Sequence, residues 1–183
     1  MVSRRGYRLI AWLMATTLAL HAEARPPGQG GPDYVTRDQM EPDKCASIWL
    51  IRRHIAPHAR IRLVPPDQPL PPGILFDTPD APIRRTHAQS TFEVLVDRHR
   101  IDDAKVRWLA RIMHDIEINT WQRKALARTQ QIEAELWRLI EAPGDLGMVD
   151  RCVQWLDRLQ MPEGADAGVG GGGNAGAPRP ARR

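Results

Sequence analysis

Hydrophobic residues recur at helical spacing from residue 42 onward. Pro42 suits the first position of a helix, and Ala56-Pro57 ends the pattern. The apolar positions between them fall on one stripe: Cys45, Ile48, Ile51 and Ile55. We therefore expect a first helix over residues 42–55.

Three short extended segments follow, separated by proline-rich turns. Ala59–Val64 alternates apolar and polar residues, and five prolines lie between Pro65 and Pro72. Gly73–Asp77 and Ile83–His87 flank a second turn that contains two more prolines. This pattern predicts a small sheet.

The second half of the chain is helical in pattern. Ser90 and Glu93 have the spacing of a capping box, so a helix over about 90–99 is expected. Asp102-Asp103 caps the next helix, whose buried face consists of Val106, Leu109, Met113 and Ile116. Two more helices are expected, over about 122–141 and from about 145, the last with Val149, Cys152, Leu156 and Leu159 on one stripe. The predicted class is α+β, predominantly helical, with about five helices around a small sheet of short strands.

The N-terminus has the form of an export signal. Arg4, Arg5 and Arg8 precede the twelve-residue apolar run Leu9–Leu20, and Ala22-Glu23-Ala24 is an A-x-A cleavage site. The run is too short to span a bilayer, and no later stretch is apolar enough. We predict a signal peptide over 1–24, a periplasmic or secreted protein and no membrane span after cleavage. A partial twin-arginine match leaves the export route open.

Amino-acid composition divides residues 25–183 into three parts. Residues 25–37 are expected to be a flexible linker and 38–161 the folded domain. Residues 162–183 are expected to be a disordered Gly/Pro-rich tail, because 163–183 hold seven of the fourteen glycines.

Charge and cysteine content restrict the function. The sequence pI is about 9.6, but residues 25–162 hold 20 Lys and Arg against 19 Asp and Glu, so we expect no nucleic-acid binding. The two cysteines, Cys45 and Cys152, are compatible with a disulfide in an oxidising compartment and equally with two buried thiols.

No triad elbow, phosphate-binding glycine loop or HExxH motif is present, so the chemistry must come from scattered polar residues. Imidazole and carboxylate groups from separate elements could form an open site for a divalent metal ion of unknown identity. We assign His87, Glu93 and His114 to this candidate site, with Asp77, Asp115 and Glu117 as further ligands. In the structural alternative, Glu93 only caps its helix and the histidines only bond their neighbours.

Arg52 and Arg53 lie late in the first predicted helix. A guanidinium fork suits a tetrahedral oxyanion, so both are candidates for oxyanion binding. Alternatively, the pair complements the negative end of the helix dipole and bonds surface carboxylates.

Several segments resemble the chromate resistance protein family. Asp43–Ile55 is similar to its D-R-x-A-x-x-W-L-I-R-R-x-I signature. Four shorter matches follow in the family's order: Phe76-Asp77, Thr86-His87, Thr91-Phe92-Glu93 and His114-Asp115-Ile116-Glu117. The family includes the C-terminal domain of ChrB-type regulators and shorter exported forms, and this chain resembles the shorter kind.

The resemblance implies a role in chromate resistance. It also implies cysteines at the positions of Ser47 and Ser90, and both are serines here, which argues against thiol chemistry at those positions. We therefore expect an exported chromate-resistance-like protein that binds a metal ion or oxyanion in the periplasm. The alternatives are a metal-dependent redox enzyme and a noncatalytic partner of another envelope protein.

Overall fold

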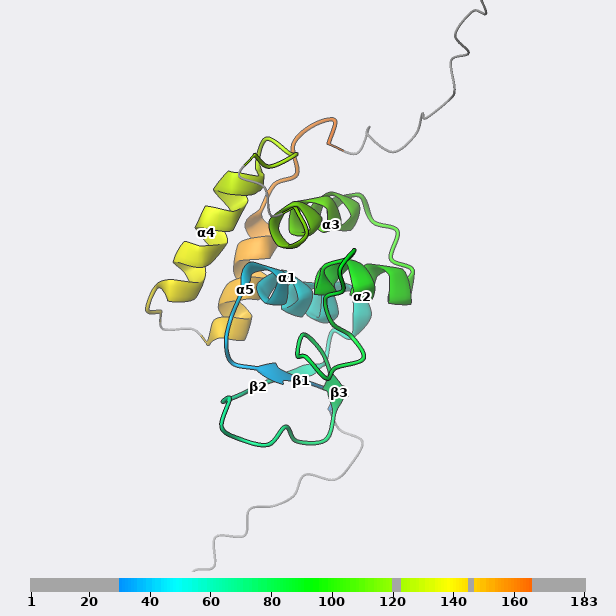
Figure 1. The fold of residues 1–183 in the computed structure, drawn as a ribbon, viewed down its shortest axis with the longest axis vertical. Helices are drawn as coiled ribbons and strands as arrows, with labels where there is room; N and C mark the ends of the chain where they lie inside the picture. The colour runs from blue at the N-terminus through cyan, green and yellow to red at the C-terminus, as the bar shows by residue number, and fades with distance from the viewer. Residues whose placement is uncertain (1–29, 120–122, 145–146, 166–183) are drawn as a thin grey trace, which may run out of the picture.

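The computed structural model describes residues 30–119, 123–144 and 147–165, and the expected signal peptide lies outside these ranges. The described residues form five α-helices and one three-stranded sheet, so the predicted α+β, predominantly helical class is confirmed. The helices lie to one side of the small sheet (Figure 1). Within these ranges, no helix has the length and hydrophobicity needed to cross a bilayer.

The sheet is parallel, and its central strand was not expected. Strand β1 (Asp33–Arg37) pairs with β2 (Arg60–Val64) on one side and with β3 (Ile74–Leu75) on the other. The predicted linker over 25–37 is therefore wrong for residues 33–37. Tyr34, Val35 and Thr36 favour extended backbone and are buried, so pairing and burial outweigh the Pro/Gly context that suggested a linker.

Helix α1 (Pro42–Leu50) is the central helix of the molecule. All nine of its residues are buried, and it packs against α2, α3, α4 and α5. It continues into a π-helical segment, η1 (Ile51–Ile55), which ends with the bond from Ala56 N–H to the Ile51 carbonyl at 2.7 Å. The predicted extent of this helix is confirmed. The change to wider hydrogen bonding over its last turn was not foreseen.

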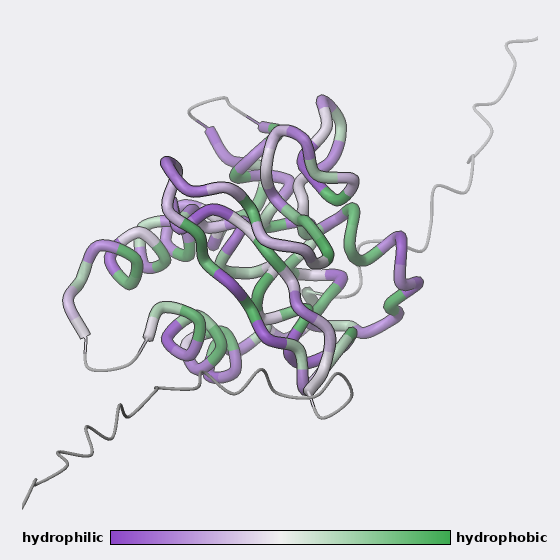
Figure 2. The backbone as a smooth tube through the Cα atoms, turned by 90° about the horizontal axis from the view of Figure 1, so that it is seen from below, coloured by the Kyte–Doolittle hydropathy of each residue, from purple (hydrophilic) through white to green (hydrophobic). Residues whose placement is uncertain are grey.

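Local caps start the next two helices as expected. Helix α2 (Thr91–His99) begins with the predicted capping box, in which Glu93 N–H donates to Ser90 Oγ and Ser90 N–H donates to Glu93 Oε2. Helix α3 (Ala104–Glu117) is capped by Asp103. Its predicted face is buried at Val106, Leu109 and Met113. Hydrophobic and hydrophilic residues alternate around the turns of the helices (Figure 2).

Helices α4 (Thr129–Glu141) and α5 (Met148–Arg158) complete the fold. The prediction of a helix starting near residue 122 is wrong, because residues 123–128 form a loop. The buried Asp115 carboxylate accepts hydrogen bonds from the N–H groups of Ala125 and Leu126, and these bonds hold that loop in place of a helical turn.

The predicted strand over residues 83–87 is reduced to one bridge. Only Ile83 pairs, with Phe76. Beyond it, the Thr86 hydroxyl accepts hydrogen bonds from Ala88 N–H and Gln89 N–H, so the backbone turns toward α2.

A disulfide joins Cys45 of α1 to Cys152 of α5, with the two Cα atoms 5.3 Å apart. Both residues are fully buried. The sequence left open whether the two cysteines form a disulfide or remain as buried thiols, and the structure shows the disulfide. It links α5 covalently to α1.

Candidate functional site

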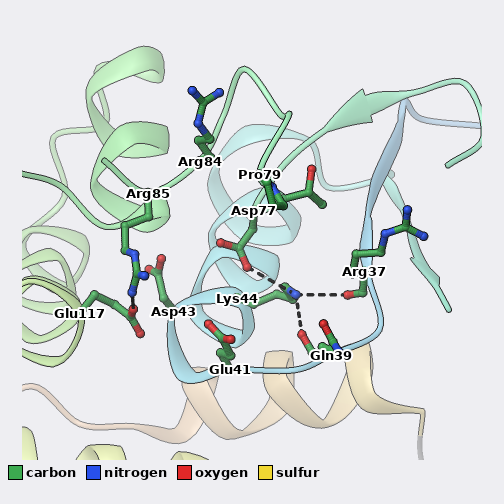
Figure 3. Close-up of a pocket in the computed structure, with 11 residues that line it drawn as sticks. Arg37, Gln39, Glu41, Asp43, Lys44, Asp77, Pro79, Arg84, Arg85 and Glu117 are labelled. Carbon is green, nitrogen blue, oxygen red and sulfur yellow. Dashed lines mark hydrogen bonds and ion pairs between the residues drawn. The ribbon is translucent and has the colours of Figure 1, made fainter. Parts of the chain in front are cut away.

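A charged pocket of about 360 Å³ lies beside the N-terminus of α1 (Figure 3). Its walls come from the end of β1, the start of α1, the loop over 77–85 and the last turn of α3. Ligands of open sheets often bind beyond the carboxyl ends of parallel strands, and this pocket occupies that position relative to β1. It has four acidic and four basic lining residues: Glu41, Asp43, Asp77, Glu117, Arg37, Lys44, Arg84 and Arg85.

Asp43 is buried in a helix that is otherwise largely apolar. Its carboxylate accepts hydrogen bonds from Thr91 N–H at 2.7 Å and Phe92 N–H at 3.1 Å, the first free donors of α2. Burial raises the pKa of Asp43 to about 8, the carboxylates of Asp77 and Glu117 add to the rise, and the two N–H donors oppose it. The start of α1 is thus tied to the start of α2 through one carboxylate.

Lys44 is also buried, with only 5% of its side chain exposed. Its ammonium donates to the backbone carbonyls of Arg37 and Gln39 and lies 3.6 Å from Asp77 Oδ2. Buried charges are tolerated when they are paired and hydrogen-bonded, and Lys44 meets both conditions. This ammonium fixes the end of β1 against the loop that carries Asp77.

Asp77 has a left-handed backbone with φ of 50°, a conformation that aspartate tolerates better than most residues. Its Oδ1 accepts a hydrogen bond from the Thr91 hydroxyl at 2.7 Å. The Asp77 carboxylate thus lies between Lys44 and the first residue of α2.

Glu117 and Arg85 form the opposite wall. Arg85 Nη1 donates to Glu117 Oε2 at 2.6 Å, and only 10% of the Glu117 side chain is exposed against 55% for Arg85. Burial raises the pKa of Glu117, and the hydrogen bond from Arg85 opposes that rise. Carboxyl groups with raised pKa values in a concave site are typical of functional sites.

The predicted metal ligands are brought together only in part. His114 Nδ1 lies 3.0 Å from Glu93 Oε1, while Glu93 Oε2 caps α2. His87 is exposed. Nowhere in the described ranges do three or more His, Cys, Asp or Glu side chains form a group that could hold a metal ion.

Among the remaining candidates, Asp77 and Glu117 line the pocket and Asp115 does not. Asp115 is buried and accepts hydrogen bonds from four donors: Asn119 Nδ2, Ala125 N–H, Leu126 N–H and the Thr129 hydroxyl. Burial alone would raise its pKa, but these donors lower it to about 2. Its role in this arrangement is to hold the loop before α4.

The two predicted oxyanion ligands lie in η1, outside the lining of this pocket. Arg53 forms a bidentate pair with Asp157 of α5, whose Oδ1 also accepts a hydrogen bond from Trp49 Nε1. Arg52 Nε is buried and has no hydrogen-bond partner within the described residues. The Arg53 contact corresponds to the structural alternative, a cation that bonds a surface carboxylate.

Ser47 and Ser90, the two positions where the resemblance implied cysteines, differ in role. Ser90 caps α2, whereas the Ser47 hydroxyl is buried without a partner in the part of the chain that the structure describes. The cysteines that are present are joined to each other.

Sequence reasoning missed four residues of the pocket lining that matter here: Glu41, Asp43, Lys44 and Arg85. A signal was available for two of them, because Asp43 and Lys44 are charged residues within a segment that otherwise reads as a buried helix. Glu41 and Arg85 are exposed and carried no such signal.

Comparison with known proteins gives one family. A family model described as "ChrB, C-terminal domain" matches residues 34–162, which include every described helix and most of the sheet. Searches of curated proteins and of solved structures gave no match. Three of the matching motifs supply lining residues of the charged pocket, at Asp43-Lys44, Asp77 and Glu117. Thr91, from a fourth, donates hydrogen bonds to Asp43 and Asp77. This chain therefore belongs to the ChrB C-terminal domain family, the chromate resistance family that its sequence motifs indicated.

Proposed function

We propose that this protein is exported, contributes to chromate resistance outside the cytoplasm, and binds a small inorganic ion in the charged pocket. One observation carries the proposal. Residues from three family motifs far apart in the sequence, Asp43-Lys44, Asp77 and Glu117, line one pocket, and Lys44 and Asp77 form an ion pair there.

The cost of assembling this pocket supports a binding role. Asp43 and Lys44 are almost fully buried, and burying charged groups is unfavourable unless each is paired. Both groups are paired within the fold, Asp43 with two N–H donors and Lys44 with two carbonyls and Asp77, and both also line the pocket. The fold thus places two buried charges in the wall of a pocket, where they can also act on a charged ligand.

Export is supported by the sequence of residues 1–24 and by the Cys45–Cys152 disulfide, since structural disulfides persist mainly in oxidising compartments. The disulfide also bears on the redox alternative. With both cysteines joined and buried, neither sulfur is a free thiol for reducing a substrate. Binding of an ion requires no electron donor, and we prefer it for that reason.

The proposal is tested by binding and by resistance. Purified protein is titrated calorimetrically with chromate and, separately, with Mn²⁺, and one of the two is expected to bind with one site per chain. A double variant, Arg85→Ala with Glu117→Gln, should weaken that binding at least about tenfold, because it removes one wall of the pocket. Glu141→Gln, an exposed change at the end of α4, serves as the control.

The same variants are expressed in a chromate-sensitive bacterium. Wild type and Glu141→Gln should raise the chromate concentration that the cells tolerate, and the double variant should not. Full protection by a stable, exported double variant would show that the pocket has no part in resistance.

A further inference from the structure

The pocket interior is acidic in character, although its lining holds equal numbers of acidic and basic residues. Lys44 is already bonded to two carbonyls and lies beside Asp77, and Arg85 is bonded to Glu117. Arg37 donates to the carbonyls of Pro65 and Gln68, and Arg84 to that of Ala81. Each cation is thus engaged by protein oxygens.

The carboxylates, by contrast, repel one another. Asp43 Oδ2 and Asp77 Oδ1 both accept hydrogen bonds from Thr91, from its N–H and its hydroxyl, and Glu117 lines the same pocket. In Figure 3 the guanidinium groups of Arg37 and Arg84 point away from Asp77, whereas Asp43, Asp77 and Glu41 lie around the middle of the pocket. An added positive charge would relieve this repulsion, and an added oxyanion would increase it.

Thr78 supplies an independent observation. It is 6% exposed, it is one of the residues that line the pocket, and its hydroxyl is buried without a hydrogen-bond partner among the described residues. Buried hydroxyls nearly always have a partner. A water molecule carried into the pocket by a ligand would provide one.

The dimensions favour an ion that keeps its water. No set of three or more His, Cys, Asp or Glu residues in the described ranges closes around a single ion. A pocket of about 360 Å³ instead accommodates a cation with a full shell of waters, at about 30 Å³ for each water. Hard cations such as Mg²⁺ retain several waters and bind through few carboxylates.

We infer that the ion bound in this pocket is a hydrated hard cation, held through its waters by Glu41, Asp43, Asp77 and Glu117, with the Thr78 hydroxyl bonded to one of those waters. This inference rests on the proposed function and specifies the class of ion. Asp43 and Lys44 shape the site from α1, and Arg85 holds Glu117 in place.

Mn²⁺ is the probe, because the electron paramagnetic resonance signal of the free hydrated ion is lost on binding. We expect one Mn²⁺ per chain, displaced by excess Mg²⁺, and no competing binding of chromate. Asp77→Asn and Glu117→Gln should each weaken binding at least about tenfold, and Thr78→Val, which changes no charge, about threefold. Asp150→Asn on α5 is the matched acidic control, and circular dichroism verifies the fold of each variant.

Chromate binding without Mn²⁺ binding would overturn the cation assignment and leave the proposed pocket function intact. If neither ion binds, both proposals fail. Unchanged Mn²⁺ binding in folded Asp77→Asn and Glu117→Gln would locate the ion elsewhere and overturn the site. Unchanged binding in Thr78→Val would remove the role of its hydroxyl.

Discussion

At the scale of single residues, the buried carboxylates of this protein have opposite tasks. Asp43 and Asp115 are both buried, and both accept backbone N–H groups. Four donors surround Asp115 and lower its pKa, whereas burial and acidic neighbours raise the pKa of Asp43 against the opposing effect of its two donors. The charged form of Asp115 is therefore stabilised within the fold, whereas burial and acidic neighbours favour the protonated form of Asp43 at the pocket.

Asp115→Asn should destabilise the domain by about 2–3 kcal/mol at pH 7, because an amide cannot accept bonds from all of these donors and leaves buried N–H groups unpaired. The native carboxylate has a lowered pKa, so its stabilisation is present above about pH 4 and is lost as the pH falls through about 2. Urea unfolding at pH 7 and pH 2 measures both effects. Equal midpoints for wild type and variant at pH 7 would contradict this role.

Asp43 leads to a pH dependence of binding. A proton on Asp43 competes with a bound cation, so the affinity for Mn²⁺ should rise as the pH increases from 6 to 9, through the raised pKa of about 8. The other charged groups facing this carboxyl are Glu41, Lys44, Asp77, Arg85 and Glu117. Titrations with Mn²⁺ at several pH values across this range measure how the affinity changes with pH. An affinity that falls with pH would be the opposite of what the site requires.

At the scale of elements, helix caps and hydrophobic spacing predicted most of the helices. The elements that were predicted wrongly, β1 and the loop before α4, depend on contacts between residues far apart in the sequence. The caps at Ser90 and Asp103 lie within four residues of what they stabilise, so sequence sufficed to start α2 and α3. β1 needs partners 27 and 40 residues away, at Arg60 for Asp33 and at Ile74 for Tyr34, and its own five residues do not reveal them. The loop before α4 depends in the same way on Asp115.

The disulfide should contribute strongly at this scale, because it closes a long loop between α1 and α5. For a sequence separation of 107, the chain-entropy model gives about 4–5 kcal/mol, as an upper value. Cys45→Ala with Cys152→Ala, compared with wild type by chemical unfolding, should lower the free energy of unfolding by about 3–4 kcal/mol. A loss below 1 kcal/mol would mean that packing alone holds α5.

At the scale of the whole molecule, the sequence indicated the family and the outline of the site but not its centre. The predicted grouping of His87, Glu93 and His114 relied on residue type, and the structure shows contact only between Glu93 and His114. Asp77 and Glu117, placed second, line the pocket. The convergence of Asp43, Lys44 and Arg85 on them depends on how α1 meets the loop over 77–85, which no local pattern encodes.

Export is a prediction at this scale as well. Protein recovered from the cell envelope should begin at Arg25, because the Ala22-Glu23-Ala24 sequence is the site that a signal peptidase recognises. N-terminal sequencing gives the answer directly. Protein that retains Met1 and remains in the cytosol would contradict the proposed location.

The central claim is that the charged pocket binds a small inorganic ion, and nuclear magnetic resonance of the ¹⁵N-labelled protein tests it most directly. Substoichiometric Mn²⁺ should broaden the amide resonances of Asp77, Thr91 and Phe92, whose N–H groups lie at or beside the pocket. The resonances of Val153 and Leu156 in α5 should stay sharp. Chromate, added separately, reports whether an oxyanion shifts the same amides. Spectra in which neither ion affects the pocket amides, or in which the effect centres on another part of the molecule, would contradict the account.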